Sequence, residues 1–450
     1  MRRTLGGLIL ALALVGVQAA YVAASLGWLH RPRQVRETDH AVYIEMARSP
    51  VGRAAVDPPF CARVGVPQLA RALERAGLDL NASFYLITNV GLVLFLLALH
   101  VQLGSLGFSP LLATLGTVLA ALLPAAVRWY EYQYWMTDPA CLFLVTLALG
   151  SLRSGREWPL PALGAVGMVV RETYLLVFLA HAAWLLRRRR WPKALLRAAL
   201  FALPGLATAA YVRLALVSCP EDDVLATIAD VIGFRARHLL DNQLYFATLG
   251  SFGALLALAL AAPRLLAARF RQHPEEATLL VFAYASLAAA NNTDRLLVYA
   301  APALLPAALE PIRAAAARGR AQGLALGAAA LAAQAFFWVV TPWREMGVSI
   351  YQPTNLWVVA VMLALWGLAR RIGTPPPGPA SRTASHGRRS LAPEAPGANP
   401  MLPGRRRPHN GMVPCPRRAS PTTFSGSHSA PVRWARSGWR RTPAFTGSSR

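Results

Sequence analysis

Long apolar runs recur along this chain, and they constrain its fold more than any other feature. One runs from Leu5 to about Trp28, and others of similar length follow. A helix needs about 20 apolar residues to cross about 30 Å of hydrocarbon. The chain has 450 residues, of which 55% are hydrophobic and 15% are charged, a composition too apolar for a water-soluble globule of this size. We therefore predict an all-α polytopic membrane protein.

The predicted domains meet at residue 373. Residues 1–373 contain the apolar segments and form a membrane-embedded domain with a long first extracytoplasmic loop at 30–83. Residues 374–450 are rich in Pro, Ser, Gly and Arg and have no hydrophobic periodicity, so they predict a disordered basic tail. This tail is either a cytoplasmic low-complexity extension or the product of a shifted reading frame.

The strong positive charge does not by itself indicate a nucleic-acid partner. The tail supplies 13 Arg and one acid, Glu394, and hence 12 of the formal net charge of +25. Lys193 is the only lysine in the chain. Arginine used everywhere in place of lysine is typical of a GC-rich coding bias, so we expect no nucleic-acid binding.

Basic clusters orient the helices by the positive-inside rule. The segment between Arg156 and Arg187 has arginines at both ends, so both ends should be cytoplasmic. We predict two short or re-entrant half-helices there, which turn at Arg171-Glu172, while Arg153 and Arg156 mark an exposed turn. Both termini are then cytoplasmic, with about 12 transmembrane or re-entrant helices in all. Beyond the first run and this pair, helices are predicted near 84–103, 109–127, 139–152, 196–217, 244–262, 277–291, 295–312, 322–341 and 355–369.

With this topology, separate polar clusters fall on or near the outer face. They are Asp39, Asp138, Arg171-Glu172, Asp222-Asp223 and Asp294-Arg295. An ionisable group at membrane depth costs on the order of 3 kcal/mol, so such groups mark a protein-lined wet cavity, although pairing at a helix break also explains them. For the two acids beside helix starts, Asp138 and Asp294, helix capping is an equal alternative.

Three other features of the segments predicted to lie on the outer side of the membrane each allow two interpretations. The aromatic run 129–135, which includes Tyr134, suits an interfacial belt and also a surface on which a sugar or prenyl chain stacks. The loop 218–242 has helical apolar spacing and predicts an amphipathic surface helix, passive or a lid. Cys61 and Cys219 both lie outside and could pair, but two unrelated small residues are the favoured interpretation.

Short motifs in residues 30–310 resemble one known family. Asp39 with Tyr43 behind it, Pro59-Phe60 with Arg63, and Thr137-Asp138-Pro139 are three of them. Arg171-Glu172-Thr173 and Asp294-Arg295-Leu296-Leu297 are two more. Together they resemble the glycosyltransferase C superfamily, whose members use polyprenyl-phosphate sugars as donors. The first loop departs from the family, because Asp39 is followed by His40 where many members have a second acid, a role that Glu37 could fill.

The resemblance implies a mechanism and a set of site residues. Sugar would move from a polyprenyl-phosphate donor to a lipid, glycan or protein acceptor in a single displacement with inversion. Asp39 would act as the general base on the acceptor hydroxyl, with Glu37 as the second candidate acid. A guanidinium fork matches phosphate oxygens, so the candidates to hold the leaving phosphate are Arg63, Arg171 and Arg295; a loop arginine at the headgroup level is an equal alternative for Arg63. The remaining expected substrate-binding residues are Tyr43, Tyr134, Asp138, Glu172 and Asp294.

The same resemblance sets the expected surroundings of the enzyme. A bacterial cytoplasmic (inner) membrane is expected, with membrane lipids as partners and the active site on the outer face. The residues leave open whether a divalent metal takes part, and no other cofactor is indicated. Two rival classes remain, a polytopic secondary transporter and a non-catalytic membrane scaffold. A transporter predicts matching broken helices in both halves, and a scaffold predicts that Asp39 is replaceable.

Overall fold

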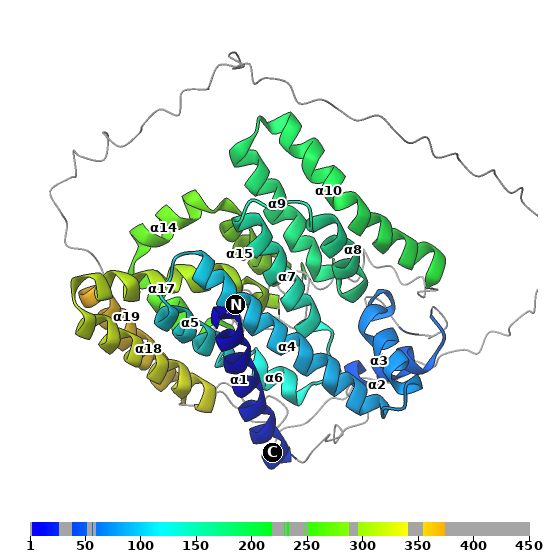
Figure 1. Ribbon diagram of the computed structural model, residues 1–450, viewed down its shortest axis with the longest axis horizontal. Coiled ribbons are helices and arrows are strands. Elements are labelled where there is room, and N and C mark those ends of the chain that lie inside the picture. Colours follow the sequence, from blue (N-terminus) through cyan, green and yellow to red (C-terminus); the bar gives the residue numbers. More distant parts are fainter. Residues whose placement is uncertain are drawn as a thin grey trace, which may run out of the picture. The chain divides into compact units, whose positions relative to one another are not determined.

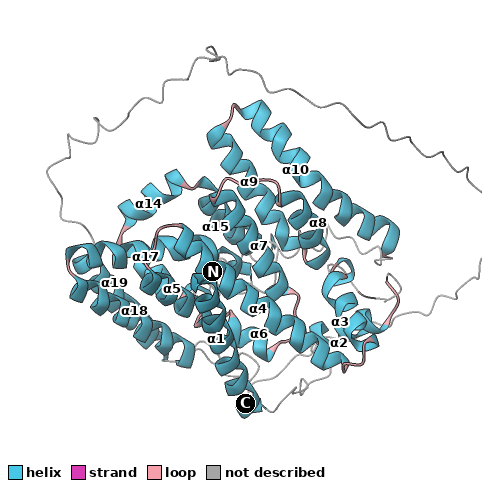
Figure 2. Cartoon of the chain, viewed as in Figure 1, coloured by secondary structure: helices cyan, strands magenta, loops and turns pink. Residues whose placement is uncertain are grey.

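The computed structural model describes residues 2–26, 38–51, 60–217, 251–287, 296–340 and 354–373, with a few isolated residues between them. Within these ranges the regular structure is helical and no strand occurs (Figure 2). The prediction of an all-α fold is confirmed for this part of the chain. The predicted tail at 374–450 and the predicted surface helix within 218–242 lie outside the described residues.

Four described helices are long and apolar enough to cross a membrane. They are α1 (Arg2–Leu26), α4 (Leu80–Ser105), α10 (Trp191–Tyr211) with the π-helical turn η3 (Val212–Leu216), and α18 (Arg320–Val340). Their length and hydropathy support membrane insertion. The larger number of about 12 membrane helices is not confirmed by these four.

The predicted first loop contains helices of its own. These are α2 (Thr38–Arg48), the 3₁₀ turn η1 (Phe60–Ala62) and α3 (Gly65–Arg75). Two side chains of α3 bind the end of α2, because Gln68 Nε2 donates to the Met46 carbonyl at 2.9 Å and Arg71 Nη1 to the Ser49 carbonyl at 2.6 Å. Helix α4 then begins at Leu80, four residues before the predicted start, because the Asp79 carboxylate caps its first N–H groups.

Helix α7 (Asp138–Arg153) packs along α4 at the centre of the described fold (Figure 1). At their contact, a Cβ on Gly91 would lie 3.0 Å from the Pro139 backbone, so the absence of a side chain permits the close approach. The predicted helix 109–127 is shorter than expected. It ends as α5 (Pro110–Ala121) and is followed by the separate short helix α6 (Val127–Tyr132).

The predicted break at Arg171-Glu172 is confirmed. Helix α8 (Leu160–Val170) stops before Arg171, whose backbone is extended, and the 3₁₀ turn η2 (Glu172–Tyr174) leads into α9 (Leu175–Arg188). Eleven helical residues in α8 span only about 17 Å at about 1.5 Å per residue. Helix α8 therefore does not cross about 30 Å of hydrocarbon by itself.

The remaining described helices follow the predicted order with shifted ends. They are α13 (Ala254–Ala261), α14 (Pro263–Gln272), α15 (Pro274–Ser286), the 3₁₀ turn η5 (Val298–Ala300), α17 (Ala301–Arg318) and α19 (Thr354–Gly373). Helix α17 is buried along most of its length and packs against α13, α18 and α19. It keeps its helical course despite Pro306 and Pro311, because packing on several sides offsets the lost hydrogen bonds.

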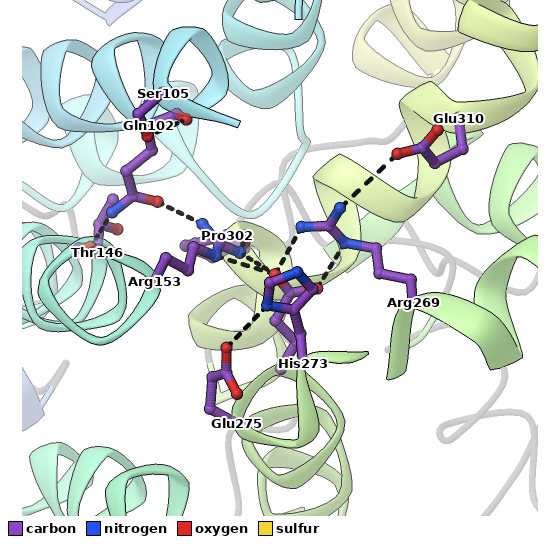
Figure 3. Close-up of polar contacts among 10 residues, drawn as sticks. Gln102, Ser105, Thr146, Arg153, Arg269, His273, Glu275, Pro302 and Glu310 are labelled. Atoms are coloured by element: carbon purple, nitrogen blue, oxygen red, sulfur yellow. Dashed lines mark hydrogen bonds and ion pairs between the residues drawn. The ribbon is translucent and has the colours of Figure 1, made fainter. Parts of the chain in front are cut away.

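A buried ion-pair network joins the ends of several helices (Figure 3). Its centre is Glu276 of α15, whose side chain is 0% exposed. Arg153 Nε donates to Glu276 Oε1 at 2.9 Å, and Arg269 Nε of α14 donates to Glu276 Oε2 at 2.7 Å. Arg153 also donates to Gln102 of α4 at 2.6 Å and to the Pro302 carbonyl of α17 at 2.9 Å. The predicted exposed turn is present at residues 154–156, including Arg156, but the Arg153 side chain departs from the prediction, because it is 3% exposed and bound on three sides.

Cys61 of η1 is disulfide-bonded, while Cys141 of α7 is a free, buried thiol. The interpretation of Cys61 as an unpaired small residue is therefore wrong. Its partner lies outside the described residues, and the pairing with Cys219 stays a prediction. A disulfide in this segment is typical of a non-cytoplasmic compartment.

Removing Cys61 should expose a thiol elsewhere in the chain. After unfolding without reductant and alkylation, Cys61→Ala is expected to take up one label more than the wild-type protein by mass spectrometry, because its former partner becomes free. Cys141→Ala is the matched control and should take up one label fewer, since Cys141 is already a free thiol. If Cys61→Ala also takes up one label fewer, Cys61 is not paired.

Candidate functional site

The helix break between α8 and α9 faces the first loop, and one arginine connects them. Arg63, just after η1, binds Glu172 of η2 with two donors, Nε to Oε2 at 2.9 Å and Nη2 to Oε1. The third donor, Nη1, bonds the Tyr43 hydroxyl of α2 at 3.1 Å. The Arg63 guanidinium also lies over the Phe60 ring, 4.9 Å from its centroid. Residues 43, 63 and 172 thus form one hydrogen-bonded group.

A second ion pair lies next to the first. Arg171, in the extended residue between α8 and η2, binds the Asp138 carboxylate at the start of α7 through Nη1. Its Nε donates to Thr173 Oγ1 at 3.2 Å, and the Tyr299 hydroxyl of η5 donates to Asp138 Oδ1 at 3.1 Å. Asp138 makes no side-chain capping bond, the N-cap residue being Thr137. The capping interpretation of Asp138 is therefore wrong, and its carboxylate serves the ion pair.

The two pairs influence each other. Burial and the nearby Arg171 lower the pKa of Arg63, but Tyr43 and Glu172 outweigh them, so the net pKa of Arg63 is raised. Burial raises the pKa of Glu172, but the charge and hydrogen bonds of Arg63, the charge of Arg171 and a backbone hydrogen bond together bring the pKa down to about 2. Both groups are therefore charged at neutral pH. Two arginines and two carboxylates balance in charge, as a low-dielectric site requires.

The pKa of Glu172 makes the stability of the pair depend on pH. Its pKa falls from an ordinary value of 4.5 to about 2 on folding, so the pair contributes fully above about pH 4.5 and is lost as pH falls toward 2. The contribution is about 1–2 kcal/mol, since solvent reaches 31% of the Glu172 side chain and weakens the pair.

Glu172→Gln is expected to lower the melting temperature in detergent at neutral pH, because it leaves the Arg63 charge buried without its partner. The difference from wild type should shrink as pH falls from about 4.5 toward 2. Glu74→Gln, at an exposed position of α3, is the control and should melt like the wild-type protein throughout. If the melting temperature of Glu172→Gln stays below that of the wild-type protein by the same amount across this pH range, the Arg63–Glu172 ion pair is contradicted.

The predicted base Asp39 lies in the first turn of α2 and is partly exposed. It precedes Tyr43 by four residues, so the two side chains lie on one helical face about 5–6 Å apart at Cβ. The next residue, His40, packs edge-on against the Trp135 ring at 4.7 Å, and its Nε2 lies 3.4 Å from Asn81 Oδ1 of α4. Asp39 therefore lies one helical turn from Tyr43, which bonds Arg63.

The aromatic run 129–135 lies inside the fold rather than at its surface. Tyr130, Tyr134 and Trp135 are each at most 2% exposed. The Tyr134 ring packs edge-on against Tyr85 at 5.7 Å, and its carbonyl accepts from Thr88 Oγ1 at 2.6 Å. The interfacial-belt interpretation is wrong for these three side chains. Tyr134 as a substrate-binding residue stays a prediction, with its ring in the core of the described fold.

Sequence reasoning missed Tyr299 and Glu131. Glu131 of α6 is 1% exposed, and neither carboxylate oxygen completes a hydrogen bond within the described part of the chain. Burial raises the pKa of Glu131 to about 7, although Tyr85 and Asn89 of α4 oppose the rise. The signal was present in the sequence, because Glu131 is the single acid in the aromatic run. Tyr299 stands in a largely apolar stretch of the sequence and gave no such signal.

Some expected site residues are not placed. Glu37, Asp294 and Arg295 lie outside the described residues. Among the residues that are described, no group of three or more His, Cys, Asp or Glu side chains could hold a metal ion. The structure therefore brings together Tyr43, Arg63, Asp138, Arg171 and Glu172.

Comparison of this chain with protein-family models, with curated proteins and with solved structures finds no match. The class of protein defined by the observed residues is an all-helical protein with four potential membrane spans and a buried double ion pair at a helix break.

Proposed function

We propose that this chain is a membrane glycosyltransferase similar to the glycosyltransferase C superfamily. The donor is a polyprenyl-phosphate sugar, and the acceptor is a lipid, glycan or protein outside the cytoplasm. The sugar moves in one displacement with inversion at its anomeric carbon, and the lipid phosphate leaves.

One observation carries this proposal. Five of the ten residues expected from short, separate motifs lie in two adjacent ion-pair groups, although they come from the first loop, the start of α7 and the α8–α9 break. Asp39 lies one helical turn from this group on α2. A base beside paired charges at the ends of membrane helices suits chemistry on a charged lipid at the membrane surface.

Each site residue is assigned a role from the chemistry of its side chain and the hydrogen bonds that it makes. The Asp39 carboxylate accepts the proton of the acceptor hydroxyl as the sugar bond forms. Arg63 uses three N–H donors for Glu172 and Tyr43, and a guanidinium has five, so two remain for a phosphate oxygen. Asp138 and Glu172 orient the arginines rather than touch the sugar. Glu37, Asp294 and Arg295 keep their expected roles, and a divalent metal stays open.

The membrane setting belongs to the same proposal. About 12 transmembrane or re-entrant helices, cytoplasmic termini and an active site on the outer face of a bacterial inner membrane account for the charge distribution. The disulfide at Cys61 supports an outer location of the first loop.

The proposal is tested by reconstituting the full chain in liposomes with a panel of radiolabelled polyprenyl-phosphate sugars and a membrane extract as the source of acceptors. Label from at least one donor is expected to move to an acceptor and to scale with protein. If no donor is used, uptake of solutes by the same liposomes would favour the secondary transporter, and its absence the non-catalytic scaffold.

A further inference from the structure

The turn between α9 and α10 concentrates positive charge at the surface. Arg187 to Arg190 and Lys193 are five cations within seven residues, and all are exposed. Within the described part of the chain, none of the five forms an ion pair. The acid beside this turn, Glu157, is already bound by Arg197 at 2.7 Å and approached by His181 at 3.5 Å. The cluster therefore repels itself and attracts an anion from outside the chain.

Helix α10 places this charge at one end of an apolar surface. Leu196, Leu200 and Leu203 are 65%, 57% and 57% exposed and share one helical face with Lys193 by their spacing of three and four residues. The most apolar window of this helix is only 17% buried in the described fold. Such a face suits contact with lipid chains. The cations lie at the end of this face where α10 begins.

Two tryptophans mark the same level. Trp191, the first residue of α10, is 69% exposed, and Trp158, just before α8, is 79% exposed. They lie at the same end of the α8–α10 group, because Arg197 of α10 binds Glu157 with two donors at 2.7 and 3.2 Å. Exposed tryptophans next to cations are typical of the headgroup level of a bilayer.

We propose that the basic surface formed by Arg187–Arg190, Trp191 and Lys193 binds the phosphate headgroup of an anionic phospholipid, whose acyl chains lie along the exposed leucines of α10. The partner is a lipid rather than a soluble phosphate, because the exposed leucines follow Lys193 directly along α10 (labelled in Figure 1). This binding requires insertion in a membrane but not the transfer of a sugar.

The test uses Trp191 fluorescence of the full chain in nanodiscs of zwitterionic lipid with a minor share of a brominated lipid. The signal of Trp191 is obtained by subtracting the spectrum of Trp191→Phe. Brominated phosphatidylglycerol is expected to quench this signal at lower mole fraction than brominated phosphatidylcholine, and added salt should reduce the difference. Each cation contributes about fivefold in local enrichment, so Arg189→Gln with Arg190→Gln should remove most of the preference.

Two further variants keep the result interpretable. Replacing the same two arginines with lysine should retain the preference, because a headgroup is attracted by charge. Arg318→Gln with Arg320→Gln removes two exposed cations from the α17–α18 turn and should leave it unchanged. Equal quenching by both brominated lipids in the wild-type protein, or a preference that survives in the Arg189→Gln, Arg190→Gln variant, overturns the proposal.

Discussion

Replacing Asp39 with asparagine is expected to lower the rate of sugar transfer by about 10²–10⁴-fold, the usual contribution of a general base. Asparagine keeps the size of the side chain but cannot take the proton of the acceptor hydroxyl. Asp39 is partly exposed at the start of α2, so the variant should insert and fold like the wild-type protein. The measurement is the initial rate of transfer in liposomes at matched protein content.

The control for this variant lies on the same helix. Glu45 is exposed and bonds Ser49 Oγ at 2.8 Å, so Glu45→Gln makes the same chemical change away from the ion pairs. It should transfer sugar at a rate close to wild type. Transfer that survives in Asp39→Asn would move the base to another residue, with Glu37 as the next to replace.

Replacing Glu276 with glutamine is expected to be among the most destabilising single changes in the described fold. It leaves the buried Arg153 guanidinium without a carboxylate and Arg269 with only the more distant Glu310 carboxylate at 3.7 Å; the two arginine side chains are 3% and 9% exposed. Removing one partner of a buried pair costs about 3–5 kcal/mol. The readout is the midpoint of unfolding in detergent, which should fall sharply, together with the yield of folded protein.

Glu310 provides the matched comparison within the same network. Its carboxylate lies 3.7 Å from Arg269 Nη1, and its shorter bond, at 2.6 Å, is to Arg313 of α17, whose side chain is 49% exposed. Solvent can therefore replace this bond, and Glu310→Gln should lower the unfolding midpoint much less than Glu276→Gln. If the two variants lower the unfolding midpoint by similar amounts, the buried Glu276 contributes no more to stability than the more exposed Glu310 bond.

Local sequence patterns predicted the features that depend on a few neighbouring residues. Arginines at both ends of 156–187 were enough to predict the break at Arg171-Glu172, because one crossing would leave a cluster on the wrong side. Apolar length predicted α4, α10 and α18 within a few residues. The helices of the first loop, α2 and α3, were missed, because they are short and their order depends on contacts with each other and with α4.

The same reasoning predicted that the site residues lie on the outer side of the membrane. It could not predict which of their side chains form ion pairs with one another. Arg63 and Glu172 are 109 positions apart, and no local spacing encodes such a contact. Arginines near helix ends were interpreted as exposed because that is their usual place. Arg153 departs from it, since Glu276 from another helix binds it inside the fold, together with Arg269. Tyr299 was missed because its hydrogen bond to Asp138 also joins residues far apart in the sequence.

In the proposed reaction, a carboxylate activates the acceptor hydroxyl for one displacement at a lipid-linked sugar. The most direct measurement is the anomeric configuration of the transferred sugar, determined by NMR on product made from a donor of known configuration. Inversion is expected, because one base on the acceptor and a leaving phosphate give one displacement. Retention of configuration would require a covalent sugar intermediate on the protein and would contradict it.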